Sequence, residues 1–140
     1  IDFKMLRSGV MAIYESGEDY LETILLLHEK TGFVRSVDIA CELNYSKPSI
    51  SRAVNILKES GYITVGAGGQ ILLTDLGREK AESIYERHVN ITRFFEKVLN
   101  VSRENAEHDA CKIEHIISTE SYEKLKQFTE DYVSGKESLS

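Results

Sequence analysis

Apolar residues recur at three- and four-residue intervals in the first part of the chain, which is the spacing of one face of an α-helix. Tyr20, Ile24 and Leu27 follow this pattern, so we expect a helix over 16–31. A shorter run with the same spacing occupies 36–43, where the serine at its first position can cap a helix. The two runs predict a long helix followed by a short one.

A third helix is predicted over 47–60, because Pro48 occupies the first turn, where its missing N–H costs nothing, and an apolar stripe follows. After this helix, 62–65 and 70–73 are two short runs of mainly apolar and β-branched residues, separated by the sequence Gly-Ala-Gly-Gly. Such runs on either side of a glycine-rich turn indicate a β-hairpin. Two helices separated by a tight turn and followed by a hairpin indicate a winged helix-turn-helix.

The remainder of the chain predicts helices only. One begins at Thr74-Asp75 and meets no helix-breaking residue before Asn100. A second begins at Ser102, and a third begins at Thr119 or Ser121. The expected fold is therefore mainly α, with a small β-hairpin as the wing.

We divide this fold into two domains. A winged helix-turn-helix DNA-binding domain is expected over 1–75, with 1–15 as an N-terminal extension. An all-helical metal-binding and dimerisation domain is expected over 76–140, with 76–98 as the linking helix.

Composition restricts the class of protein. The 140 residues are 41% hydrophobic and 29% charged, as in folded soluble proteins rather than disordered chains. No apolar run approaches the roughly 20 residues of a membrane-spanning helix, and no signal peptide is recognisable, so we expect a cytoplasmic protein with no membrane partner. The two cysteines, Cys41 and Cys111, are too few for a disulfide framework, and we expect Cys41 to face the core.

The third predicted helix carries the residues expected to contact DNA. The net charge of -6 argues against nonspecific coating of nucleic acid, but 43–58 holds three basic residues and no acidic one. Small and polar residues at the start of a recognition helix fit the major groove, where an arginine can reach a guanine edge. The candidate DNA-binding residues are Ser46, Lys47, Pro48, Ser49, Ser51, Arg52 and Lys58. A capped, solvated helix with scattered charge is the alternative interpretation.

The tip of the predicted wing is nearly all glycine and has no basic side chain. It is therefore expected to reach the DNA backbone, if at all, through main-chain N–H groups.

Cys111, Glu114 and His115 have a spacing that places them at neighbouring positions on one face of a helix. A thiol, a carboxylate and an imidazole so placed form half of a metal site. The same spacing also arises by chance, and a buried cysteine beside a surface Glu-His pair is the alternative.

Several fragments of the chain share their order and spacing with one known family. They are Asp-Tyr-Leu-Glu at 19–22, Val-Asp-Ile-Ala at 37–40, Ser-Ile-Ser-Arg at 49–52, Leu-Thr-Asp-Leu-Gly at 73–77, Glu-Arg-His at 86–88 and Glu-His-Ile-Ile-Ser at 114–118. In these fragments the chain resembles the diphtheria toxin repressor and manganese transport regulator family of metal-dependent transcriptional repressors. It ends near the point where the iron-sensing members continue into a third, barrel-like domain, so it resembles the short two-domain members.

The resemblance implies a set of metal ligands, which are Asp19, Glu22, His88, Cys111, Glu114 and His115. Asp19 and Glu22 match the manganese-sensing branch of the family, whereas Cys111 matches the iron-sensing branch. The implied cofactor is therefore Mn(II) or Fe(II), and Zn(II) or Co(II) are expected to bind in vitro.

The iron-sensing branch also has an ancillary metal site. His88 matches one of its ligands, but Thr92 stands where that branch has a glutamate. Glu107 or His108, about one turn before Cys111, could supply a substitute ligand. An exposed polar residue on a helix is the alternative for both.

The function that the resemblance implies is metal-activated repression of metal-uptake genes by a homodimer that binds a palindromic DNA operator. An enzyme is not expected, because no nucleophile, general base or glycine-rich substrate loop accompanies the candidate ligands. The alternatives are a winged-helix regulator that metal does not control, and a metalloenzyme that uses the same ligands.

Overall fold

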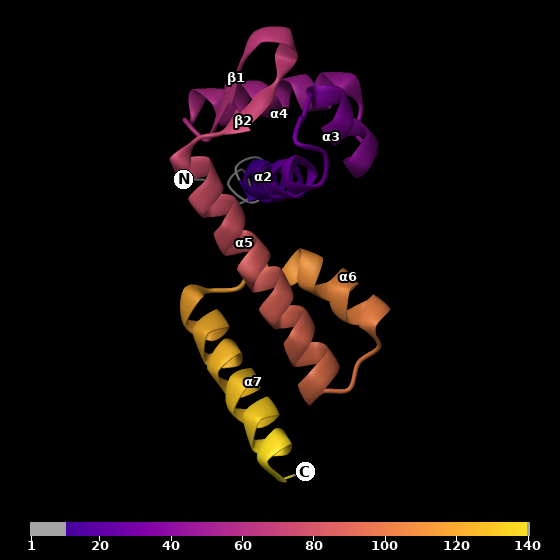
Figure 1. The fold of residues 1–140 in the computed structure, drawn as a ribbon, viewed down its shortest axis with the longest axis vertical. Helices are drawn as coiled ribbons and strands as arrows, with labels where there is room; N and C mark the ends of the chain where they lie inside the picture. Colours follow the sequence, from indigo (N-terminus) through magenta and orange to yellow (C-terminus); the bar gives the residue numbers. More distant parts are fainter. Residues whose placement is uncertain (1–10, 140) are drawn as a thin grey trace. The chain divides into compact units, whose positions relative to one another are not determined.

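A computed structural model of the chain describes residues 11–139, including the side chains of 17–135. These residues form two compact units, of which the first ends at Glu82 and the second begins at Ser83 (Figure 1). Within the described part of the chain, no helix is both long enough and apolar enough to cross a membrane.

The first unit is a winged helix-turn-helix, as predicted. Its elements are α2 (Met11–Thr31), α3 (Ser36–Leu43), α4 (Lys47–Glu59), β1 (Ile63–Val65) and β2 (Ile71–Leu73). The two strands pair antiparallel, with Thr64 opposite Leu72, and a 3-10 turn over Ala67–Gly69 joins them. Helix α2 contacts α3, α4 and β2, so it is the central element of this unit.

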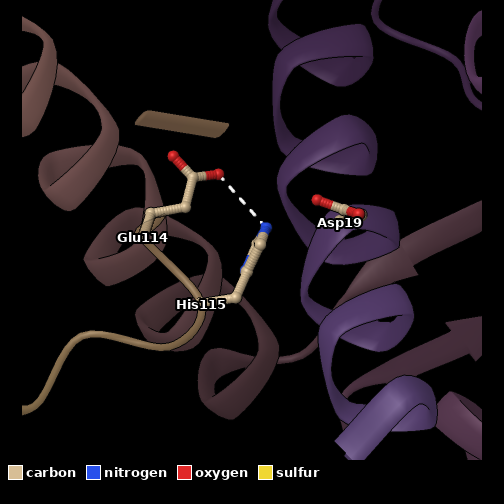
Figure 2. A group of neighbouring side chains, drawn as sticks. All are labelled: Asp19, Glu114 and His115. Carbon is tan, nitrogen blue, oxygen red and sulfur yellow. Dashed lines mark ion pairs between the residues drawn. The ribbon is translucent and has the colours of Figure 1, made fainter. Parts of the chain in front are cut away.

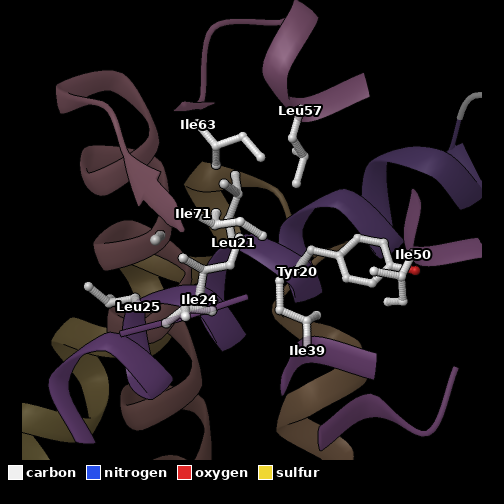
Figure 3. Close-up of a cluster of buried hydrophobic side chains, with 11 residues drawn as sticks. Tyr20, Leu21, Ile24, Leu25, Ile39, Ile50, Leu57, Ile63 and Ile71 are labelled. Carbon is white, nitrogen blue, oxygen red and sulfur yellow. The ribbon is translucent and has the colours of Figure 1, made fainter. Parts of the chain in front are cut away.

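One apolar cluster holds the first unit together (Figure 3). It combines side chains from α2, α3, α4 and both strands, namely Tyr20, Leu21, Ile24, Leu25, Ile39, Ile50, Leu57, Ile63 and Ile71. Ile24 and Ile71 have no exposed surface at all. Because full burial of one such side chain contributes about 1.5–3 kcal/mol, this cluster fixes which face of α4 remains exposed to solvent.

Three local expectations for this unit are wrong. Helix α2 begins at Met11 rather than Ser16, since 11–15 contains no glycine or proline to prevent it. The N-cap of α3 is Arg35 rather than Ser36, and the main-chain N–H of Arg35 donates to the Asp38 carboxylate at 2.9 Å. Cys41 is exposed rather than in the core, because it lies two positions from the buried Ile39, on another side of the helix.

The second unit is helical. Helix α5 (Asp75–Arg93) passes into a π-helical turn, η3 (Phe94–Val98), and α6 (Arg103–Ile113) and α7 (Thr119–Leu139) follow. Asn100 ends the long helix by adopting a left-handed φ of 58°, which asparagine tolerates better than most residues. Ser102 caps α6 by accepting a hydrogen bond from the Asn105 N–H, and the core of the unit contains Ile91, Ala110 and Tyr122.

Helix α5 begins in close contact with the hairpin. The Thr74 hydroxyl donates to the Gly61 carbonyl at 2.6 Å and accepts from the Gly77 N–H at 3.1 Å. A Cβ at Gly77 would lie only 1.9 Å from the Tyr62 carbonyl oxygen. Glycine at this position therefore lets the helix start directly against Tyr62, the residue that precedes β1.

Gly77→Ala is expected to destabilise the protein by about 1–3 kcal/mol, because the added methyl would overlap the Tyr62 carbonyl and force the backbone apart. Gly135→Ala in α7 is a matched control, since its added Cβ meets no atom within 4 Å. That control should be neutral or stabilising by up to about 1 kcal/mol through helix propensity. Urea unfolding measures both, and an unchanged midpoint for Gly77→Ala would contradict the close approach.

Candidate metal centre and DNA-binding surface

Four of the six predicted metal ligands come together in the second unit. His88 lies on α5, Cys111 near the end of α6, and Glu114 and His115 in the turn that follows. Nδ1 of His88 is 2.9 Å from Oε2 of Glu114 and 3.8 Å from Sγ of Cys111. Nε2 of His115 is 3.3 Å from Oε1 of Glu114 (Figure 2). Each oxygen of the Glu114 carboxylate therefore contacts one imidazole.

The local fold accounts for this arrangement. The Glu114 N–H still donates to the Ala110 carbonyl at 3.0 Å, so Glu114 lies one helical turn beyond Cys111 and on the same side. Glu114 is 2% exposed. A buried carboxylate costs several kcal/mol unless charged or hydrogen-bonding groups compensate it, and the two imidazoles provide that compensation.

His88 carries a proton in this arrangement at neutral pH. Hydrogen bonding to Cys111 and then to Glu114 raises the pKa of His88 from 6.5 to about 10, against the opposing effect of burial. With Nδ1 protonated, the ring donates to the carboxylate. In the protein without metal, the buried Glu114 carboxylate therefore contacts a positively charged imidazolium.

The donor atoms of this cluster fit a divalent transition metal. Two imidazoles, a carboxylate and a thiol are ligands that iron, zinc, cobalt and manganese accept, with the thiol favouring the softer ions. Nδ1 of His88 and Oε2 of Glu114, 2.9 Å apart, are close enough to bind one ion at about 2 Å each. An ion bound to His88 would replace its proton, since imidazole binds metals in the neutral form.

Without metal, stability should fall as the pH rises. The folded-state pKa of His88 lies above the ordinary value of 6.5, so its stabilising contribution is complete below pH 6.5 and is lost as the pH approaches about 10. Urea unfolding in EDTA and a reductant at a series of pH values measures this loss.

His88→Gln should flatten that dependence on pH, whereas His108→Gln should retain it, because the side chain of His108 is 67% exposed. Identical pH profiles for wild type and His88→Gln would contradict the assignment of the raised pKa to His88.

Arg87 holds the turn that carries Glu114 and His115. Its Nη1 donates to the Ile117 carbonyl at 2.9 Å and its Nη2 to the Thr119 hydroxyl at 3.3 Å, while its guanidinium lies over the Tyr122 ring at 5.2 Å. Asn90 donates to the Tyr122 hydroxyl at 2.9 Å. Helix α5 is thereby joined to the residues immediately after the candidate ligands.

The role of Arg87 was not predicted from the sequence, where it is marked only by its place before His88 in Glu-Arg-His. Its partner is the main-chain carbonyl of Ile117, and a pattern of side chains does not show which main-chain carbonyls accept hydrogen bonds.

Arg87→Met is expected to weaken metal binding by about 10- to 100-fold, because supporting partners of metal ligands typically contribute that much. Arg87→Lys, which keeps the charge but not the two-pronged hydrogen bonding, should show a smaller loss. Competition with a fluorescent chelator measures the affinity, and the Co(II) absorption spectrum reports the ligand geometry.

Arg78→Met is the matched control on the same helix, since within the described part of the chain the side chain of Arg78 makes one long ion pair, of 3.9 Å with Glu82. Unchanged affinity and spectrum in Arg87→Met would show that the turn is held without this arginine.

Asp19 and Glu22, the other two predicted ligands, lie on α2 in the first unit. Their spacing of three places them on one face of that helix, and Figure 2 labels Asp19 there. Their participation in one site with the ligands of the second unit stays a prediction.

The described residues give little support to a second, ancillary metal. Arg103 donates to Glu107 at 3.0 Å and to Glu96 at 2.8 Å, so a guanidinium already neutralises these carboxylates. His108 is exposed. Among the residues that the structure describes, neither Glu107 nor His108 belongs to a group of three ligands close enough to share an ion. Thr92 is buried and contributes only a hydroxyl.

All seven candidate DNA-binding residues are exposed on or beside α4, whereas Ile50 and Leu57 on its other side are buried. Ser46 caps the helix by accepting from the Ser49 N–H at 3.4 Å and donating to the Ser49 hydroxyl at 2.9 Å. The cap fixes the start of α4, and Lys47 and Arg52 remain on the solvent side. This polar, basic face is suited to the major groove; DNA contact by the seven residues stays a prediction.

Two family models match most of the chain. Residues 12–67 match the N-terminal DNA binding domain of iron dependent repressors, and 74–134 match their metal binding and dimerisation domain. The transcriptional regulator MntR of Salmonella typhimurium is 33% identical over 120 residues, which cover 86% of this chain and 76% of MntR. The chain belongs to the iron-dependent repressor family. The family and the class of function predicted from the sequence fragments, a metal-dependent transcriptional regulator, are thereby confirmed.

Other members of the iron-dependent repressor family extend this comparison. An HTH-type transcriptional regulator of Methanocaldococcus jannaschii is 33% identical over 119 residues, covering 84% of this chain and 95% of that protein. The structure of the manganese regulator SloR matches with a TM-score of 0.73 and 29% identity, covering 81% of this chain. The chain spans about half the length of SloR (53%).

Proposed function

We propose that this member of the iron-dependent repressor family is a homodimeric repressor that Mn(II) or Fe(II) activates to bind a palindromic operator upstream of metal-uptake genes. The observation that carries the proposal is the buried Glu114 carboxylate between two imidazoles, in a chain whose other unit is a winged helix-turn-helix. A buried acid with two histidines and a neighbouring thiol offers the donor types that a divalent transition-metal ion binds.

The proposed ligands are His88, Cys111, Glu114 and His115, completed by Asp19 and Glu22. Because Asp19 and Glu22 belong to the first unit and the others to the second, one ion bound by both sets would couple the DNA-binding unit to the metal site. The ion need only bind the DNA-competent arrangement more tightly than the others, since a ligand shifts an equilibrium by its difference in affinity. By reciprocity, operator DNA should then tighten metal binding.

The ligand chemistry favours two ions for different reasons. Asp19 and Glu22 would supply hard carboxylate oxygens, which suit manganese, and the similarity to MntR and to the manganese regulator SloR supports that ion. The Cys111 thiol would favour Fe(II), which binds sulfur more readily. Zn(II) and Co(II) are expected to bind in vitro by the same chemistry.

Dimerisation would use apolar surface of the second unit. Leu99, Ile116 and Phe128 expose 53%, 61% and 55% of their surface there, and residues 74–134 match a dimerisation domain. A two-fold dimer would present two copies of α4, which requires two half-sites about one helical turn of DNA apart. A regulator of this kind is expected in the cytoplasm, where its DNA is.

Operator binding should depend on metal. DNA duplexes selected from a random pool by the wild-type protein with Mn(II) provide the probe, and binding is measured with Mn(II), Fe(II), Zn(II), Co(II) or EDTA. We expect affinity to rise by at least tenfold with the activating ion. Glu114→Gln, which keeps the volume but removes the charge, should bind DNA equally with and without metal.

Glu104→Gln on the exposed surface of α6 is the matched control and should respond to metal like the wild type. Equal affinity of the wild-type protein in Mn(II), Fe(II) and EDTA would favour a winged-helix regulator that metal does not control. Failure to select any DNA would reject the repressor itself.

A further inference from the structure

The wing has no charge of its own. Residues 63–73 contain no acidic or basic side chain. Two main-chain donors at the tip are already used within the turn, since the Gly66 N–H donates to Gln70 at 2.8 Å and the Gly69 N–H donates to Gly66 at 3.2 Å. A phosphate contact from the wing can use main-chain N–H groups or positive charge, and any positive charge must come from a side chain outside 63–73.

Arg35 lies beside the wing tip. The connection between α2 and α3 is joined to the wing by a hydrogen bond of 2.8 Å from the Ile71 N–H to the Val34 carbonyl. The next residue, Arg35, extends along the turn, and a Cβ on Gly68 would be 3.8 Å from its Nη2. The guanidinium of Arg35 therefore lies where a side chain at Gly68 would touch it.

A second contact orients the same guanidinium. Its central carbon lies 4.9 Å from the centroid of the Phe33 ring, in a cation–π arrangement. Such stacking restricts the rotamers of a long side chain before any partner binds, so less conformational entropy is lost on binding. Phe33 therefore restricts the position of the charge beside the wing.

Among the residues whose side chains are described, none accepts a hydrogen bond from this guanidinium. Arg35 is exposed, and its guanidinium makes no hydrogen bond or ion pair within the described residues. The nearby acid, Asp38, accepts instead from the main-chain N–H of Arg35 at 2.9 Å. An arginine keeps its charge at any physiological pH and offers a planar set of donors that matches two phosphate oxygens.

We propose that Arg35 is the phosphate-binding side chain of the wing, and that it binds a phosphodiester of the DNA backbone beside the groove that α4 enters. The proposal rests on the proposed DNA-binding function. The connection between α2 and α3 thereby supplies the side-chain contact to phosphate that the glycine-rich tip cannot make, since the tip has no charged side chain. The contact is with the backbone, so it adds affinity and position without reading sequence.

The position of Arg35 in the fold supports a backbone contact. It is the N-cap of α3, the first helix of the helix-turn-helix pair, and this helix crosses the DNA backbone in such motifs. The N–H groups at a helix N-terminus also favour a negatively charged partner. Arg35 thus combines a fixed side-chain cation with the positive end of a helix.

The salt dependence of DNA binding tests this contact. Arg35→Gln and Arg35→Lys are compared with wild type on a duplex selected from a random pool by the wild-type protein with Mn(II). Arg35→Gln should reduce the slope of log affinity against log salt by about 0.9 for each protomer bound. Arg35→Lys keeps the charge and should retain the wild-type slope.

Lys124→Gln is the charge-matched control, because it removes one exposed positive charge from α7 and should leave the slope unchanged. Phosphate-ethylation interference gives an independent measure. Ethylation of particular phosphates outside the base pairs read by α4 should impair the wild-type protein and Arg35→Lys, but not Arg35→Gln.

A wild-type slope and interference pattern in Arg35→Gln would overturn the assignment and leave the repressor function standing. A slope lowered equally by Arg35→Lys and Arg35→Gln would also overturn it, since that result would indicate a packing role for the side chain. If the wild-type protein selects no DNA, both this inference and the proposed function fail.

Discussion

A carboxylate is rarely buried alone, and the second unit of this protein is organised around the burial of Glu114. The carboxylate is compensated by His88 from α5 and by its own neighbour, His115. For the contact with His88 to form, the end of α6 must stay close to the middle of α5. Arg87 maintains that closeness by binding the main chain just beyond the ligands. The packing of Ile91 against Ala110 and Tyr122 supports the same pair of elements from the apolar side.

The first unit separates its apolar and charged residues in a way that resolves the conflict between a net charge of -6 and DNA binding. Burial of Ile50 and Leu57 turns one face of α4 inward and leaves the face bearing Lys47 and Arg52 outward. Arg35 adds a further cation beside the uncharged wing. Electrostatic attraction to DNA depends on this local field rather than on the sum over the chain.

The elements that sequence predicted well are those with a periodic apolar face or a strong cap. Ile50 and Leu57 identified α4, Ser102 identified the start of α6, and the hairpin followed from its glycines. The grouping of Cys111 and Glu114 was also predictable from sequence, because the two residues are neighbours on one helical face. The predictions that were wrong are those that depend on tertiary contacts. Cys41 is apolar enough for a core but lies on the wrong side of a short helix.

Arg87 and Arg35 illustrate the same limit for function. Each contacts a main-chain or ring partner that side-chain patterns in the sequence do not reveal. The ancillary ligands proposed from helical spacing, Glu107 and His108, show the converse. Spacing placed them near Cys111, but it did not reveal that Arg103 already binds Glu107.

The close approach of Gly77 to the Tyr62 carbonyl has a mechanical consequence. The first turn of α5 cannot pivot against the hairpin, because Thr74 binds the Gly61 carbonyl on one side and the Tyr62 carbonyl fills the space where a side chain would be. Helix α5 continues without a break to Arg93, and His88 lies about three turns beyond Gly77. Within the first unit, a displacement of the hairpin would therefore carry the first turn of α5 with it, because no space separates the two backbones at Gly77.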